Sequence, residues 1–205
     1  KPEIDVAMKR AYNRWLGDRS DASGGRLRWA CMPPLMNMEE TIKEMRWAKD
    51  HGAVAVSKKG NQEAGKSLTD EYFDEFWKAA DELEMPVCIH IGSGIPNTRE
   101  NRTESDARGT RVPFASLPDA FTSLVMKKIP HRHPNIHWGF IEAASGWMPH
   151  ELYQIKRKLE HPGSQGPTAI QLSIADLPDG FDLLHDALRE WNVFVTCLVD
   201  EDLPY

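Results

Sequence analysis

The sequence alternates short apolar segments with amphipathic ones, and this order constrains the fold more than any other feature. Segments of strand length and β-branched or aromatic character occupy residues 26–32, 53–57, 85–91, 136–142 and 193–199. Helical spacing of apolar residues occupies residues 1–17, 38–51, 70–84, 117–128, 148–160 and 181–190. Strands that alternate with helices pair in parallel, so the pattern predicts an α/β fold.

Among α/β architectures we expect a distorted TIM barrel of the (β/α)8 type. The units are regularly spaced, and no Gly-x-Gly-x-x-Gly phosphate loop follows any strand. The composition shows no break, so residues 1–205 are expected to form a single domain. A full barrel takes about 250 residues. We therefore expect the barrel to be incomplete in this sequence, with strands missing at both ends.

Composition argues against several classes of function. The formal net charge is −6 and no basic cluster is dense, which argues against a nucleic-acid partner. No apolar run reaches the length of a membrane span, and no secretory signal opens the sequence. Cys31, Cys88 and Cys197 are odd in number and lie in strand-like segments, which predicts free thiols and a cytoplasmic location.

The segment of residues 85–94 contains the strongest candidate for a functional residue. An apolar strand ends at His90, and a glycine-rich turn follows at once. Side chains alternate along a strand, so Cys88, His90 and Gly92 share one face. The C-terminal ends of parallel strands carry the chemistry of barrels and open α/β sheets. His90 is therefore a candidate site residue, and a core histidine bonded to the backbone is the alternative.

Three segments together resemble the amidohydrolase-related metal-dependent enzymes, a family that includes aminocarboxymuconate-semialdehyde and γ-resorcylate decarboxylases. These segments are Arg26-Leu27-Arg28-Trp29-Ala30 before Pro33-Pro34, Pro86-Val87-Cys88-Ile89-His90, and Gly139-Phe140-Ile141-Glu142 before Gly146-Trp147. The resemblance implies a barrel with one divalent metal ion at its C-terminal mouth. Zinc is the first choice, and manganese or iron would also suit the mixed nitrogen and oxygen ligands that the family implies.

The resemblance also implies roles for two residues. His90 corresponds to a family histidine that binds the metal through a ring nitrogen, and we expect the remaining ligands outside residues 1–205. Glu142 stands where the decarboxylases carry a proton-handling histidine. Strand alternation puts Glu142 on one face with Trp138 and Phe140, where an unpaired carboxylate would have a raised pKa and act as a general acid or base. A metal ligand, or a structural acid paired with an arginine, is the alternative.

Four further residues are candidate substrate contacts. Arg99 and Arg111 lie in the long loop after the His90 strand, and their guanidinium groups suit a carboxylate substrate. Lys58 follows a strand, so its amine could face the barrel mouth. Trp147 could form an apolar wall over the substrate or pack in the core.

Two other clusters are weaker candidates. His131-Arg132-His133 resembles a His-x-His ligand pair but lies at the N-terminal entrance of a strand, so we interpret these histidines as solvated loop residues. Asp200-Glu201-Asp202 follows the last strand and could reach the mouth, although such acidic runs are more often merely solvated.

Together these residues predict a metal-dependent hydrolase that acts on a small, carboxylate-bearing amide, ester or lactone, with Glu142 moving the proton. Non-oxidative decarboxylation of an aromatic or unsaturated acid is the alternative reaction. A barrel subunit of a hetero-oligomeric enzyme is the alternative from a different class. The resemblance further implies a homodimer or another oligomer.

Overall fold

A single parallel sheet organises the protein. The computed structural model describes residues 1–91, 116–161 and 170–201. Its strands are β1 (Trp29–Cys31), β2 (Ala53–Lys59), β3 (Val87–His90), β4 (Trp138–Ile141) and β5 (Val193–Val195). Each strand pairs in parallel with the strand before it in the sequence, in the order β1-β2-β3-β4-β5. This sequential order is that of a (β/α) barrel and confirms the predicted fold class.

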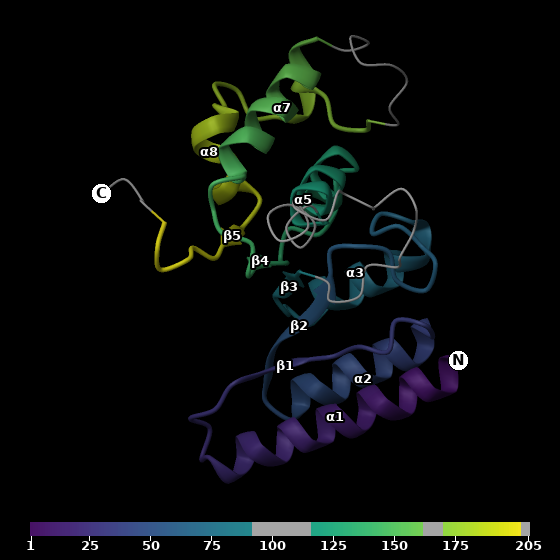
Figure 1. Ribbon diagram of the computed structural model, residues 1–205. Coiled ribbons are helices and arrows are strands. Elements are labelled where there is room, and N and C mark those ends of the chain that lie inside the picture. Colours follow the sequence, from purple (N-terminus) through teal and green to yellow (C-terminus); the bar gives the residue numbers. More distant parts are fainter. Residues whose placement is uncertain (92–115, 162–169, 202–205) are drawn as a thin grey trace, which may run out of the picture.

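Helices separate the strands and pack beside them in chain order. They are α1 (Pro2–Ala22), α2 (Met38–Asp50), the 3-10 helix η1 (Glu71–Phe73), α3 (Asp74–Glu82), α5 (Ser116–Met126), α6 (Ile129–Arg132), α7 (Met148–Glu160), the 3-10 helix η4 (Ile174–Asp176) and α8 (Leu183–Glu190). Figure 1 shows this order, with α1 and α2 near β1 and α8 near β5. Within the described ranges, no helix is both long and apolar enough to cross a membrane.

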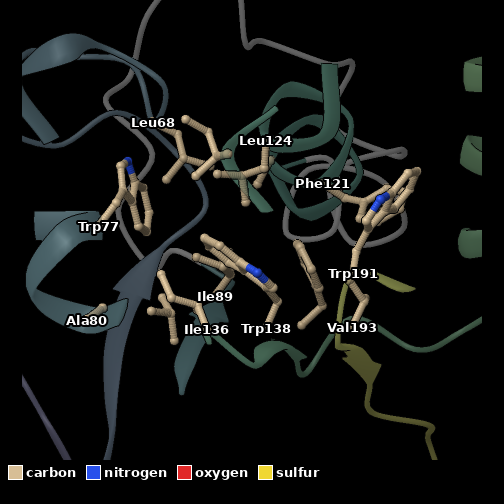
Figure 2. Close-up of a cluster of buried hydrophobic side chains, with 14 of the residues drawn as sticks. Leu68, Trp77, Ala80, Ile89, Phe121, Leu124, Ile136, Trp138, Trp191 and Val193 are labelled. Carbon is tan, nitrogen blue, oxygen red and sulfur yellow. The ribbon is translucent and has the colours of Figure 1, made fainter. Parts of the chain in front are cut away.

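The core lies between the sheet and the helices and is rich in aromatic side chains (Figure 2). Trp138 of β4 packs against Trp77 of α3, with ring centroids 5.3 Å apart. Phe140, two residues further along β4, packs edge to face against Phe121 of α5 at 5.6 Å. Because successive side chains of a strand point to opposite faces, these contacts define the face of β4 that looks toward the helices.

The opposite face of the sheet carries the candidate histidine. In β3 the fully buried residues alternate with Cys88 and His90, which are only partly buried. The strand register places His90 between Lys59 of β2 and Ile141 of β4. This is the face that lines the interior of a barrel.

The first helix is longer than the sequence predicts. The expected stop was Gly17, but α1 continues to Ala22. Gly17 is buried, and a Cβ at this position would lie 3.4 Å from the ring of Trp47. The glycine therefore allows α1 to pack closely on α2. The helix ends before Gly24 and Gly25, which both have positive φ.

Several other boundaries also differ from the prediction. The segments 26–32, 136–142 and 193–199 contribute only the shorter strands β1, β4 and β5. The expected helix over 70–84 is divided into η1 and α3, and Asp70 caps η1 by accepting from the N–H of Tyr72. The sequence pattern missed α6, which begins after Lys128 adopts a left-handed φ of 58°.

Candidate active site

His90, at the end of β3, and Glu142, directly after β4, meet at the C-terminal edge of the sheet. Nε2 of His90 lies 3.1 Å from Oε2 of Glu142. Both side chains are open to solvent, with 42% of His90 and 58% of Glu142 exposed. Since β3 and β4 are adjacent and parallel, residues that leave them at the same level come together. The two strand ends thus form a solvent-accessible pair of a histidine and a carboxylate.

The second ring nitrogen of His90 determines what this pair can do. Nδ1 lies 2.9 Å from the carbonyl oxygen of Ile91. A carbonyl can only accept, so Nδ1 carries a proton and donates it in this hydrogen bond. In the neutral ring, Nε2 would then direct a lone pair at the Glu142 carboxylate, which is unfavourable. A cation between the two side chains would remove this unfavourable contact.

A divalent metal ion fits this pair of donors. Metal bonds of about 2.0–2.2 Å place neighbouring ligand atoms roughly 3.0–3.5 Å apart. The separation of 3.1 Å between the His90 nitrogen and the Glu142 oxygen lies in that range. Donation from Nδ1 to a backbone carbonyl is also the outer hydrogen bond typical of a metal-binding histidine.

The pair alone is not a complete metal site. In the part of the chain that the structure describes, no group of three or more His, Cys, Asp or Glu side chains could hold a metal ion. A catalytic metal takes about three protein ligands and keeps one position open. His90 and Glu142 would therefore supply only part of the ligand set.

Glu142 reaches His90 because its backbone leaves the strand conformation. Strand β4 ends at Ile141, and Glu142 has a φ of 66°, in the left-handed region that residues other than glycine rarely adopt. The side chain consequently turns toward His90. The prediction that Glu142 shares a face with Trp138 and Phe140 is therefore wrong, because alternation holds only while the strand continues. The carboxylate lies neither in an apolar row nor unpaired.

Thr196, just after β5, is hydrogen-bonded to the backbone on both sides of this bend. Its Oγ1 accepts from the N–H of Glu142 at 2.8 Å and donates to the carbonyl of Phe140 at 3.3 Å. The N–H of Thr196 donates to the same carbonyl at 3.0 Å. Sequence reasoning did not single out Thr196, because nothing local connects it to β4.

Glu201 holds the same loop further along. One carboxylate oxygen accepts from the N–H groups of Ser145 and Gly146, at 2.7 Å and 3.1 Å, and from the Ser145 hydroxyl at 3.0 Å. The other oxygen accepts from the N–H of Leu198 at 2.6 Å. These bonds, first among them that of Ser145, lower the pKa of the Glu201 carboxyl. In this acidic run, Glu201 is therefore a structural link and not a solvated charge.

Lys58 points away from the His90 face. The register pairs Lys58 with Ile89, whose side chain lies in the core, and the Lys58 side chain is fully buried. Its Nζ lies 2.8 Å from Oε2 of Glu63 and 4.5 Å from the ring centroid of Phe73. Burial lowers the pKa of this amine, and Glu63 opposes the shift. The contact of Lys58 with a substrate stays a prediction. The buried position of the side chain does not support it.

The neighbouring Lys59 is a residue that sequence reasoning missed. It pairs in register with His90, so it belongs to the face of the sheet that carries the site. Two adjacent lysines at a strand end look equivalent in the sequence. Their alternation about the sheet becomes visible only when the register with β3 is known.

Trp147 packs in the core beside the site. Its indole N–H donates to the carbonyl of Ala144 at 3.0 Å. Its ring meets Phe121 and Phe140 edge to face, with centroids 6.0 Å and 5.7 Å apart. These contacts favour the packing alternative, although the side chain remains partly exposed.

The remaining candidates lie elsewhere. Arg99 and Arg111 are outside the described residues. His131 and His133 lie at α6, near the N-terminal end of β4, as the sequence predicted. Both are half-buried, and burial lowers their pKa values, so the interpretation as solvated loop histidines is wrong.

With this geometry described, comparison with known proteins defines the class of the protein. A sequence model of the amidohydrolase family matches residues 5–188. The chain therefore belongs to the amidohydrolase family. No curated protein matches the sequence.

Solved structures share this fold at low sequence identity. An amidohydrolase from Mycobacterium avium subsp. paratuberculosis K-10 gives a TM-score of 0.70 at 18% identity, covering 98% of this chain and 51% of that one. The 5-carboxyvanillate decarboxylase of Novosphingobium aromaticivorans DSM 12444, complexed with manganese and 4-hydroxy-3-methoxy-5-nitrobenzoic acid, gives 0.69 at 16% identity, covering 93% and 52%.

A third structure extends the comparison. The dihydroxybenzoic acid decarboxylase of Polaromonas sp. JS666, with bound manganese and the inhibitor 2-nitroresorcinol, gives a TM-score of 0.67 at 16% identity, covering 98% of this chain and 59% of that one. The present chain thus spans 51–59% of the length of these three structures. The likeness establishes a common fold.

Proposed function

We propose that the intact protein is a metal-dependent amidohydrolase-family enzyme that hydrolyses a small, carboxylate-bearing amide, ester or lactone. The observation that carries the proposal is the 3.1 Å approach of Glu142 to His90 at the C-terminal edge of the sheet. Barrel enzymes place their catalytic groups at this edge. His90 and Glu142 would hold one divalent ion, either zinc, manganese or iron. When bound, the ion supplies a Lewis acid that activates water at neutral pH.

His90 and Glu142 would have different roles in this reaction. His90 would bind through Nε2, because Nδ1 is occupied by its hydrogen bond to Ile91. Glu142 would have two roles: Oε2, which faces His90, would bind the ion, and the second carboxylate oxygen of this more than half exposed side chain would accept a proton from water and return it to the leaving group. Arg99 and Arg111 remain the proposed contacts to a substrate carboxylate.

Non-oxidative decarboxylation of an aromatic or unsaturated acid is the second candidate. It is favoured by the two decarboxylases of benzoic acid derivatives that share the fold. In that reaction Glu142 would deliver its proton to the ring carbon that loses carbon dioxide. The same side chain thus serves both reactions, and the destination of the proton distinguishes them.

Two substrate panels on the full-length protein test these reactions. Amides, esters and lactones that bear a carboxylate would be assayed for acid release, and hydroxybenzoates for loss of ultraviolet absorbance and release of carbon dioxide. Turnover in the first panel is expected. Rapid turnover of a hydroxybenzoate reverses the ranking. A protein that is inactive and metal-free alone but active with a partner would support the hetero-oligomeric subunit.

Elemental analysis tests the metal itself. We expect a bound divalent ion in the full-length protein and its loss in His90→Ala. Metal below about a tenth of an equivalent per chain, together with unchanged activity in His90→Ala, would overturn the proposal.

A further inference from the structure

We propose that Thr196 and Glu201 are positioning residues that hold Glu142 against His90. The inference rests on the proposed function, in which Glu142 carries the proton, and it concerns two side chains that do not touch His90. It starts from the backbone of the loop after β4. Glu142 and Ala144 have φ values of 66° and 56°, and neither is glycine. Such conformations persist only where the surrounding structure imposes them.

Thr196 imposes the first of these bends. Its hydroxyl accepts from the N–H of Glu142 and donates to the carbonyl of Phe140, so it spans the residue at which the strand ends. The N–H of Glu142 therefore has a fixed direction, and its side chain leaves the backbone on the side of His90. With a standard strand conformation, the carboxylate would point to the helix-facing side instead.

Glu201 imposes the second bend. The successive N–H groups of Ser145 and Gly146 converge on one of its carboxylate oxygens, and this arrangement is an anion cradle. The same carboxylate is tied to its own segment through the N–H of Leu198. The loop that begins with Glu142 is thus held at both ends by the chain that follows β5.

These contacts explain why a charged residue with a strained backbone can be held at this strand end. The hydrogen bonds offset the free-energy cost of the left-handed conformations. They also hold Glu142 in the position from which it approaches His90. A merely structural role for Thr196 and Glu201 would stabilise the loop without affecting that approach. The two roles predict different outcomes at His90.

The test uses Thr196→Val, Glu201→Gln and the rescue variant Thr196→Ser in the full-length protein. Thr122→Val is the matched control, because the hydroxyl of Thr122 bonds Glu151 at 2.8 Å between α5 and α7. Crystal structures would report the distance between His90 and Glu142. Competition with a chromogenic chelator would report the affinity for manganese, and thermal melting would compare the stability of all variants.

We expect Glu142 to leave hydrogen-bond distance of His90 in Thr196→Val and Glu201→Gln, and to return in Thr196→Ser. Manganese affinity should fall about 10- to 100-fold in the first two variants and stay within about threefold of wild type in Thr196→Ser and in the control. A similar loss of thermal stability in Thr196→Val and Thr122→Val would show that stability does not cause the difference.

The outcomes separate the two proposals. If the contact between His90 and Glu142 persists in both Thr196→Val and Glu201→Gln, the positioning role is overturned, whatever the metal affinity. If the wild-type protein binds no metal, the proposed function fails, and the crystallographic distance still decides the positioning role. If Thr196→Val does not fold, Glu201→Gln decides it.

Discussion

The imidazole of His90 and the carboxylate of Glu142 approach to 3.1 Å from the ends of two adjacent strands. His90 donates through Nδ1 to the carbonyl of Ile91, so its other nitrogen faces the carboxylate. Two groups that both offer lone pairs are well placed to bind a cation between them. This relationship is the basis of the first prediction.

Substitution of Glu142 should impair proton transfer, and substitution of His90 should impair metal binding. Glu142→Gln keeps the shape of the side chain but can no longer carry a proton, so kcat/KM should fall about 10²- to 10⁴-fold. His90→Ala should lose bound metal, measured by elemental analysis. The control is His150→Ala, an exposed histidine of α7. A change under about threefold in kcat/KM for Glu142→Gln would exclude proton transfer by this residue.

The pair of buried Lys58 and partly buried Glu63 should be sensitive to the loss of the carboxylate. Glu63→Gln leaves the Lys58 ammonium buried without its counter-charge and should lower the free energy of unfolding by about 3–5 kcal/mol. Adding Lys58→Met to that variant should restore most of the loss, because the buried charge is then gone. Urea denaturation measures both. Lys43→Met, at an exposed pair, should change stability by less than about 1 kcal/mol.

The same lysine should make stability depend on pH in the alkaline range. Burial lowers the pKa of Lys58 in the folded protein below its ordinary value of 10.5. Between the two values the unfolded chain binds more protons, so the contribution of Lys58 to the free energy of unfolding rises with pH. The destabilisation that comes from burying the charged Lys58 amine is fully present below the pKa of this amine in the folded protein. Lys58→Met should lack this rise, and an unchanged slope would contradict the assignment.

Glycine should stabilise the protein just after the C-cap of α3 and destabilise it two residues earlier. Glu84 is exposed and has a φ of 47° just after the C-cap Leu83. Glu84→Gly should therefore raise the free energy of unfolding by about 0.5–1 kcal/mol. Glu82→Gly, at the exposed last residue of the helix, should lower it by about the same amount. If both variants changed the free energy of unfolding in the same direction in urea denaturation, the left-handed conformation of Glu84 would be contradicted.

The three free cysteines should differ in reactivity. Cys31 is fully buried, and burial, with a contribution from the Glu44 carboxylate, raises its pKa to about 12. Because the thiolate is the reactive form, Cys31 should resist iodoacetamide at pH near 8 until the protein unfolds. Cys197 is exposed and should be alkylated first. Peptide mass spectrometry over a time course measures both, and equal rates in the folded protein would contradict the burial of Cys31.

Local patterns in the sequence were enough to establish the α/β class and to locate His90. Apolar periodicity and helix-capping residues act over a few positions, so the alternation of strands and helices can be read without knowing how they pack. The parallel order of strands then follows from the helices that connect them. The position of His90 at the C-terminal end of β3 needed nothing further, because the strand and the turn after it are contiguous.

Contacts between distant segments decided the details that matter for the site. Gly17 looked like a helix stop, but the ring of Trp47 made it a packing residue inside α1. Lys58 looked like a residue of the barrel mouth, but the register of β2 with β3 turned it toward Glu63. In both cases, a neighbour from another element decided the structural role of the residue.

Glu142 shows most clearly why local sequence does not determine the direction of a side chain. Alternation along β4 would place its carboxylate among the core aromatics, and no local signal in the sequence indicates otherwise. Its left-handed backbone is unfavourable on its own, so short-range propensities cannot predict it. The hydrogen bonds that Thr196 and Glu201, which follow β5, accept from the backbone of this loop offset that cost. The residue type was therefore visible in the sequence, while its direction depended on a segment that reaches it only after five strands have assembled into one sheet.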